Sequence, residues 1–281
     1  MVVTGQSWRF SKGHGTGNDF VILPDPAGEL VLTPKLVAGL CDRRFGIGGD
    51  GVLRVVRTAA AGEPLPAAEG AEWFMDYRNA DGSLAEICGN GARVFARYLV
   101  AAGLVETPRM TLATRAGAVA AEVTDEAVSV TLGLPTVNGE SRARVGGRDL
   151  TGVVVDCGNP HLVCPVGSER ELAALDLSRP PELDPQRFPH GANVEFVTHP
   201  PEMTGVRMRV HERGVGETLS CGSGACAAAA AVLREAGRPH GEVTVDVPGG
   251  RLAVALSGAS CVLTGPAVLV AQGSVDVSAL F

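Results

Sequence analysis

The chain of 281 residues is long enough for one large domain or two of ordinary size. It carries 24 Lys and Arg against 31 Asp and Glu, and the resulting net charge of −7 repels nucleic-acid phosphates and anionic lipid. We therefore expect no nucleic-acid or membrane partner. The first ten residues lack the apolar segment of a secretion signal, and the longest uninterrupted apolar run, 225–233, is too short to span a membrane. These features predict a cytoplasmic protein.

The seven cysteines are odd in number, and no two of them are spaced C-x-x-C. In a chain without a secretion signal this pattern argues against a disulfide framework. None of the six histidines completes a zinc-binding pattern with them. We therefore expect no metal site.

Short runs rich in valine occur in both halves of the chain and predict strands in two sheets or barrels. In chain order they are 20–23, 51–56, 73–77, 128–132, 153–156, 194–197, 206–210, 243–247, 252–256 and 267–271. The sequence VPGGRL, 247–252, joins two alternating runs and is typical of a hairpin turn. Adjacent strands are thus expected to be mostly antiparallel.

Four segments carry helix signals. Thr33 followed by Pro34 predicts an N-cap with proline at the first helical position. Ser168 and Glu171 form a capping box for a short helix ending near 175. The other two helices follow the cysteine motifs CGNGA (88–92) and CGSGA (221–225), and stop signals stand at residues 103 and 237.

The helix after the second cysteine motif is apolar on every side over 225–233. Such a helix must be covered all round, and in a chain with so many strands a curved sheet wrapped around it is the economical cover. The helix after the first motif is similar, although it carries two arginines.

The two halves share landmarks in the same order. Cys88-Gly-Asn-Gly-Ala matches Cys221-Gly-Ser-Gly-Ala, and Gly17-Asn18 before a strand matches Gly158-Asn159 before another. This order predicts two homologous domains that face one another. Short glycine motifs can also match by chance in a chain with 37 glycines, so the repeat alone does not settle the matter.

Each cysteine motif combines a thiol with a site for an anion. Glycines allow a ligand to approach the backbone, and the free amides of a first helical turn point at it. The positive helix end favours a carboxylate and lowers the pKa of a neighbouring thiol. The alternative for either cysteine is a small buried residue that caps a helix.

Two such motifs on facing domains would place two thiols on opposite sides of one bound carboxylate. One thiolate could remove the proton from the neighbouring carbon while the other thiol delivers a proton to the opposite face. The helix ends would stabilise the charge that builds on the carboxylate. This chemistry is inversion of a stereocentre without a cofactor.

Further polar residues stand in glycine-rich turns, where structural hydrogen bonds are the alternative to substrate binding. They are Asn18, Asn79, Asn159, His161, Asn193, Glu212 and Arg213. Glu212 and Arg213 could equally form a surface ion pair. RRFGIGGDG, 43–51, lacks the Gly-Lys-Ser/Thr of a phosphate-binding loop and is at most a turn that lines the substrate site.

Taken together, the sequence resembles the diaminopimelate epimerase family. The motifs KGHGTGNDF, RRFGIGGDG, RNADGSLAEICGNGAR, DCGNPH, GANVEFV and ERGVGETLSCGSGACA occur in the family's order over nearly the whole chain. The resemblance implies an α+β fold of two homologous domains, each a β-barrel-like mixed sheet around a central helix, with the active site in the cleft between them. We expect the domains at 1–133 with 270–281 and at 134–269.

The resemblance also implies an isomerase that interconverts L,L- and meso-diaminopimelate, for lysine and peptidoglycan, without pyridoxal phosphate or metal. Cys88 and Cys221 would be the two acid/base residues, and a homodimer would be in keeping with the family. His161 would support the reacting centre with Glu212, and the remaining substrate-binding residues would be Asn18, Asn79, Gly89, Asn90, Asn159, Asn193, Arg213, Gly222 and Ser223. Arg213 discriminates best, because a second carboxylate needs a fixed cationic fork.

Departures from the family pattern are small. Ser220 and Ser223 stand where Ala and Thr are common, and Val94 replaces a frequent second cysteine. Cys226 is expected in the core. The segment 59–72 is long for the family and is expected to be a surface loop.

Two other functions remain open. A racemase of another polar amino acid could use the same fold, to which proline racemase and an isomerase of phenazine biosynthesis also belong. The paired cysteines weigh against the isomerase, and the asparagines with Arg213 weigh against proline. The other function is a non-enzymatic amino-acid-binding or redox-sensing protein with labile thiols.

Overall fold

The computed structural model describes residues 7–199 and 205–280. The prediction about the first ten residues falls in part on 1–6, which lie outside this range. The chain divides into two compact units. Unit 1 comprises Met1–Val130 and Pro266–Phe281, and unit 2 comprises Thr131–Gly265.

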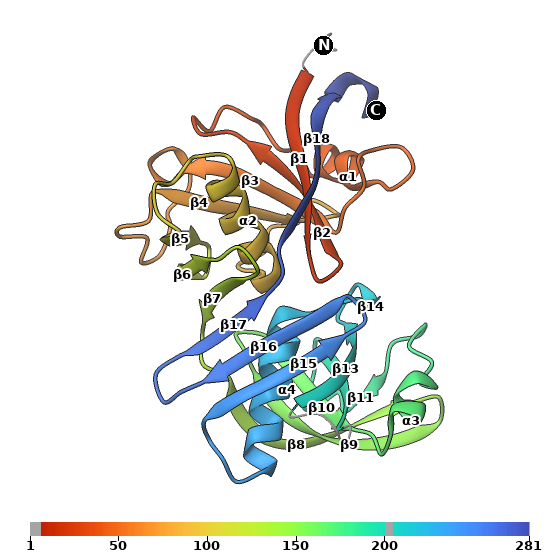
Figure 1. Ribbon diagram of the computed structural model, residues 1–281. Helices are drawn as coiled ribbons and strands as arrows, with labels where there is room; N and C mark the ends of the chain where they lie inside the picture. The colour runs from red at the N-terminus through yellow and green to blue at the C-terminus, as the bar shows by residue number, and fades with distance from the viewer. Residues whose placement is uncertain (1–6, 200–204, 281) are drawn as a thin grey trace. The chain divides into compact units, whose positions relative to one another are not determined.

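Unit 1 is a mixed sheet with two α-helices inserted between its strands (Figure 1). Its strands are β1 (Ser7–Gly15), β2 (Asn18–Pro24), β3 (Gly51–Arg57), β4 (Trp73–Asn79), β5 (Arg109–Thr114), β6 (Gly117–Val123), β7 (Val128–Leu132) and β18 (Val268–Asp276). The helix α1 (Pro34–Cys41) joins β2 to β3, and α2 (Gly89–Ala101) joins β4 to β5. Two 3₁₀ turns, η1 (Thr58–Ala60) and η2 (Val277–Leu280), complete the unit.

Unit 2 repeats this plan. Its strands are β8 (Thr136–Val145), β9 (Arg148–Asp156), β10 (Pro160–Pro165), β11 (Glu182–Leu183), β12 (Asn193–Thr198), β13 (Gly205–Glu212), β14 (Gly216–Thr218), β15 (Gly241–Val247), β16 (Gly250–Leu256) and β17 (Cys261–Gly265). The short helix α3 (Glu169–Ala173) lies between β10 and β11, and α4 (Gly222–Glu235) joins β14 to β15.

The strand pairings follow one order in both units. In unit 1, β1 and β2 are antiparallel, β2 and β3 parallel, β3 and β4 antiparallel, β4 and β5 parallel, and β5 and β6 antiparallel. In unit 2 the same alternation runs through β9, β10, β12, β13, β15 and β16. The predicted duplication is therefore confirmed, and most neighbouring strands are antiparallel, as expected. The pairs β2–β3, β4–β5, β10–β12 and β13–β15 are parallel. A parallel pair needs a crossover connection, and α1, α2, α3 and α4 lie in the crossovers of these four pairs.

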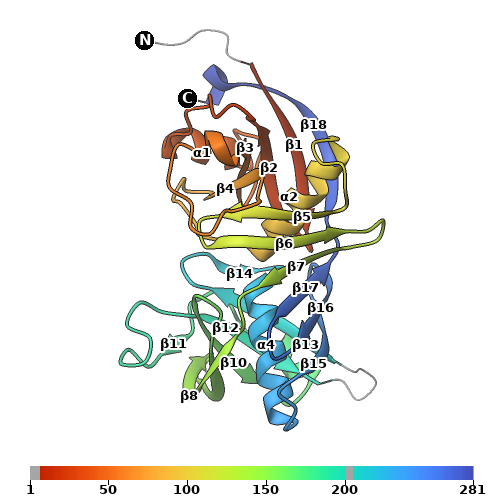
Figure 2. The same ribbon diagram turned by 90° about the vertical axis from the view of Figure 1, so that its left-hand side faces the viewer.

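Both central helices are buried by the strands of their own unit, as predicted (Figures 1 and 2). In α4 the residues from Ala225 to Ala231 and Leu233 are buried. Strands β9, β10, β12, β13, β15 and β16 surround this helix, while α2 packs on β1, β6 and β18. Cys226 is 1% exposed and belongs to this core, in agreement with its expected place.

The predicted caps and turns are confirmed. The Thr33 side chain accepts a hydrogen bond from the Leu36 amide, and Ser168 accepts from the Glu171 amide, although α3 ends at Ala173 rather than near 175. Val247 pairs with Gly250 across a two-residue turn. Short-range chemistry thus fixes where these elements begin and end.

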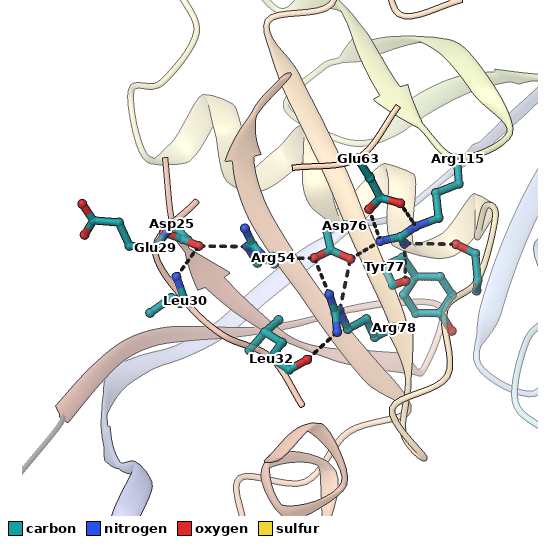
Figure 3. A network of polar contacts seen from close by, with 11 residues as sticks. Asp25, Glu29, Leu30, Leu32, Arg54, Glu63, Asp76, Tyr77, Arg78 and Arg115 are labelled. Carbon is teal, nitrogen blue, oxygen red and sulfur yellow. Dashed lines mark hydrogen bonds and ion pairs between the residues drawn. The ribbon is translucent and has the colours of Figure 1, made fainter. Parts of the chain in front are cut away.

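The segment 59–72 is a surface loop, as expected, but it is tied to the sheet of unit 1. Glu63 accepts two hydrogen bonds from Arg115, at 2.7 and 3.2 Å, and the same guanidinium donates to Asp76 at 2.5 Å (Figure 3). Asp76 also contacts Arg54 and Arg78, and Arg54 Nε lies 2.9 Å from Asp25 Oδ2. This network joins the loop to strands β3 and β4.

Candidate active site

Cys88 is the N-cap of α2. Its backbone is extended, with φ −139° and ψ 116°, and its Sγ accepts a hydrogen bond from the Gly91 amide at 3.3 Å. The first intrahelical bond runs from Ala92 N to Cys88 O, so the amides of Gly89 and Asn90 precede it and have no intrahelical acceptor. The first motif therefore has the predicted form, with a thiol at the helix N-terminus beside the amides of the first turn.

Asn18 lies against this thiol. It follows the left-handed turn at Gly17 (φ 83°) that joins β1 to β2. Asn18 Oδ1 is 3.7 Å from Cys88 Sγ and accepts from Asn90 Nδ2 at 3.2 Å. The structure thus brings three of the predicted site residues together in unit 1, from two segments about seventy residues apart.

Asn79 has a different environment. It ends β4, and its side-chain amide donates to Ser83 Oγ at 3.0 Å within the turn 79–83. The Asn79 backbone amide donates to the Ser83 carbonyl in the same turn. These bonds are the structural role that such asparagines often have.

Cys221 caps α4 in the same way. Its backbone has φ −123° and ψ 118°, and its Sγ accepts from the Gly224 amide at 3.3 Å. Ser223 Oγ lies 3.5 Å from the sulfur. The first intrahelical bond joins Ala225 N to Cys221 O, so the Gly222 and Ser223 amides are again free of intrahelical acceptors.

The expected low pKa is wrong for Cys221 in this structure. Burial raises the pKa of this thiol well above its ordinary value, and the nearby carboxylates of Glu212 and Glu195 raise it further. The hydrogen bonds from Ser223 and Gly224 act in the opposite direction but do not outweigh these effects. Cys221 is only 6% exposed, so desolvation of the charged thiolate outweighs the effect of the helix terminus.

Glu212 lies at the end of β13 beside this thiol. Burial raises its pKa, and the hydrogen bond from Thr218 Oγ1 to Glu212 Oε1 only partly opposes that effect. Glu212 forms no ion pair with Arg213 in the described part of the chain. The surface ion pair considered for these two residues is therefore not observed, and Glu212 is a half-buried carboxyl group that contacts the thiol.

His161 is completely buried between two oxygen atoms. Its Nδ1 lies 2.7 Å from Glu195 Oε1 and its Nε2 lies 3.0 Å from Asn159 Oδ1. β10 and β12 are parallel neighbours, with His161 in register with Asn193, two residues before Glu195. Both ring nitrogens of His161 thus lie within hydrogen-bond distance of a side-chain oxygen.

Glu195 was not among the residues selected from the sequence. It is 0% exposed, and its Oε1 lies 2.6 Å from where a Cβ at position 224 would stand. Gly224 is therefore required by the carboxylate behind the motif. The sequence does carry a sign of this residue, because Glu195 is an acidic residue within the otherwise apolar run VEFV of β12, and a charged residue in a buried strand needs a polar partner.

Asn193 and Arg213 are joined through the backbone. Asn193 Oδ1 accepts from the Arg213 amide at 2.9 Å, while the Arg213 side chain is exposed and its stem packs near Gly191. Within the described residues the Arg213 guanidinium has no carboxylate partner. An exposed, uncompensated guanidinium is available to an anionic ligand.

Over residues 7–199 and 205–280, no three His, Cys, Asp or Glu side chains gather into a possible metal site. None of the helices in the same ranges has both the length and the apolar character that crossing a bilayer needs.

Comparison with known proteins identifies relatives over the whole chain. A family model described as diaminopimelate epimerase matches residues 10–137 and 153–270. The diaminopimelate epimerase of Thermobifida fusca (strain YX) is 53% identical over 282 residues, which cover 97% of this chain and 99% of that protein. The diaminopimelate epimerase of Rhodococcus jostii (strain RHA1) is 50% identical over 280 residues, covering 95% and 96%.

Solved structures share the fold at low identity. A phenazine biosynthesis protein of the PhzF family from Bacillus anthracis has a TM-score of 0.73 at 18% identity, covering 96% of this chain and 99% of that one. A hydroxyproline epimerase from Agrobacterium vitis has a TM-score of 0.69 at 18% identity, covering 98% and 94%. These similarities confirm the two-domain α+β fold, and at this identity they concern the fold alone.

Proposed function

Because the chain belongs to the diaminopimelate epimerase family, we propose that it is an isomerase that interconverts L,L- and meso-diaminopimelate by proton transfer at one α-carbon. The observation that carries this proposal is the repeated device in the two units. In each, a cysteine caps a helix at which two first-turn amides have no intrahelical acceptor.

In the proposed reaction, the thiolate of one cysteine takes the α-hydrogen as a proton, and the electron pair of the C–H bond moves toward the carboxylate. The first-turn amides of Gly89, Asn90, Gly222 and Ser223 hold that carboxylate and stabilise its enolate-like charge. The other thiol then gives its proton to the opposite face of the carbon. One proton is lost and one is gained, so the configuration is inverted without net change.

The carboxyl groups of Glu212 and Glu195 in unit 2 support this proton transfer. Because the pKa of Cys221 is raised, its thiol must give its proton to a neighbour before the sulfur can act as a base. Glu212, whose own pKa is raised, is a suitable acceptor beside it. The hydrogen-bonded side chains of His161 and Glu195 lie in the same unit and provide fixed polar groups near Cys221 and Glu212.

The distal end of the substrate carries an amino group and a second carboxylate. We assign the exposed Arg213 to that carboxylate, and Asn18, Asn79, Asn159 and Asn193 to the remaining polar groups. The proposed reaction uses one cysteine from each of the two domains, for which we keep the bounds 1–133 with 270–281 and 134–269. A homodimer in the cytoplasm completes the proposal, and light scattering of the purified protein tests its subunit number.

Solvent exchange tests the function. Reduced protein and L,L-diaminopimelate are incubated in deuterium oxide without added cofactor, and α-deuterium and meso product are measured by mass spectrometry. We expect both to form, and we expect Cys88→Ala and Cys221→Ala each to lose at least about 10²-fold in rate. Cys226→Ala is the matched control, because this thiol lies in the same motif as Cys221 but in the core.

Absence of exchange in the reduced wild-type protein would contradict the proposal. Exchange with another amino acid but not with diaminopimelate would instead favour a racemase of that amino acid. Normal turnover by either cysteine variant would refute the two-thiol mechanism.

A further inference from the structure

The segment 43–51, RRFGIGGDG, has no part in the proposed reaction, yet it supplies the group that holds Asn18. Asp50 Oδ2 accepts from Asn18 Nδ2 at 2.8 Å and from the Asp19 backbone amide at 3.1 Å. The Asp50 backbone amide in turn donates to the Asp19 carbonyl at 2.8 Å. The carboxylate is therefore fixed against the start of β2 by backbone as well as side-chain bonds.

This contact determines which way the Asn18 amide points. A carboxylate only accepts hydrogen bonds, so the NH₂ group of Asn18 must face Asp50 and its oxygen must face away. The opposite side of Asn18 is where Asn90 Nδ2 donates at 3.2 Å and where Cys88 Sγ lies 3.7 Å away. The oxygen of Asn18, rather than its NH₂ group, is consequently the atom presented to the thiol.

The sulfur of Cys88 thus contacts a hydrogen-bond donor on one side and an acceptor on another. The Gly91 amide donates to it at 3.3 Å, and Asn18 Oδ1 can accept its S–H hydrogen. A protonated thiol satisfies both contacts. A thiolate would keep the contact with the amide but would stand beside an oxygen that repels it.

We propose that Asp50 is a positioning residue that fixes the amide of Asn18 and thereby holds Cys88 as the protonated thiol in the substrate-free protein. Cys88 would then begin as a proton donor, and binding of the substrate would have to disturb the Asn18 contact before Cys88 could act as a base. The inference rests on the proposed function only in giving Cys88 an acid/base role.

The neighbouring charges favour action through Asn18 over direct repulsion by Asp50. Arg43 Nη2 lies 2.7 Å from Asp50 Oδ1 and 2.6 Å from Asp19 Oδ1, and Lys12 Nζ lies 2.6 Å from Asp19 Oδ2. On α2, the buried Arg93 donates to Thr16 at 3.3 Å. The positive charges of Arg43 and Lys12 thus lie against the carboxylates of Asp19 and Asp50, and they weaken the electric field of Asp50 at the Cys88 sulfur.

Alkylation of Cys88 without substrate tests the inference. Reduced protein is treated with iodoacetamide from pH 6 to 10, and labelling of the Cys88 peptide is followed by mass spectrometry. We expect Asp50→Ala to speed labelling about threefold below the midpoint, equivalent to about half a pH unit. In an Asn18→Ala background, Asp50→Ala should change the rate by less than about 1.5-fold, because the intermediary is gone.

Equal acceleration in both backgrounds, or no acceleration in either, would overturn the inference, since Asp50 would then act by charge alone or not at all. Asp42→Ala is the control for loosening of the loop, because this carboxylate bonds the Arg44 and Phe45 amides but not Asn18. If it speeds labelling as much as Asp50→Ala, the inference also fails. Asp50→Asn serves if the alanine variant does not fold, and because no turnover is measured, failure here is distinct from failure of the epimerase assignment.

Discussion

The two cysteine motifs provide a matched pair of glycines whose replacement by alanine should have opposite consequences. A Cβ at position 224 would lie 2.6 Å from Glu195 Oε1 and 3.2 Å from Cys221 Cβ. A Cβ at position 91 would meet Leu53 Cδ2 at 3.3 Å as its nearest contact, and this is the end of a flexible side chain. The two positions are equivalent in the repeat, so helix propensity cancels in the comparison.

The size of the stability loss in Gly224→Ala depends on whether the Glu195 carboxylate can move away from the added methyl group. Glu195 is 0% exposed and is held by His161 at 2.7 Å, so its carboxylate has nowhere to retreat without breaking that bond. Overpacking of this kind costs about 1–3 kcal/mol, and the gain from replacing a helical glycine is at most about 1 kcal/mol. We therefore expect Gly224→Ala to be less stable than the wild type by about 1 kcal/mol and Gly91→Ala to be more stable than it by up to about 1 kcal/mol, so that the two variants differ by about 2 kcal/mol.

Urea unfolding followed by circular dichroism measures the difference. Fluorescence is unsuitable, because Trp8 and Trp73 both lie in unit 1 and would not report the change in unit 2. Amide hydrogen exchange in β12 should rise for Gly224→Ala and remain unchanged for Gly91→Ala. If the two variants had equal stability, the inferred contact between Glu195 and the second motif would be wrong.

Three further results are expected. Glu212→Gln removes a carboxylate that raises the pKa of Cys221, so Cys221 should be alkylated severalfold faster at pH 8; an unchanged rate would contradict the assigned coupling. Burial raises the pKa of Asp19, but its bonds to Arg43 and Lys12 outweigh this and hold it well below the ordinary 3.8. The stability that Asp19 contributes is therefore present above pH 3.8 and lost as the pH falls below it. Asp19→Asn should have a lower free energy of unfolding than the wild type at pH 7, and the difference should narrow below pH 4. A difference that stays constant in urea unfolding at acid pH would refute this. Glu63→Gln should lose about 1 kcal/mol in urea unfolding, whereas Glu69→Gln, an exposed change in the same loop, should lose none.

The sequence by itself determined the local features of this protein. Thr33 and Ser168 cap their helices, the turn after Val247 forms a hairpin, and each cysteine motif begins a helix. These features depend on hydrogen bonds between residues within a few positions of one another, so the residue types alone specify them. The repeated motifs were also sufficient to predict the family and the two-domain fold, because both predictions depend on the order of the motifs along the chain.

Only the tertiary structure decided what surrounds each thiol. Glu195 reaches His161 because β10 and β12 pair in parallel with one particular register, and Asp50 reaches Asn18 because the chain returns to β2 after α1. No local signal fixes such contacts between residues more than thirty positions apart. The pKa of Cys221 shows the consequence, since a helix terminus alone would lower it, while burial and the carboxylates of Glu212 and Glu195, at the end of β13 and on β12, raise it.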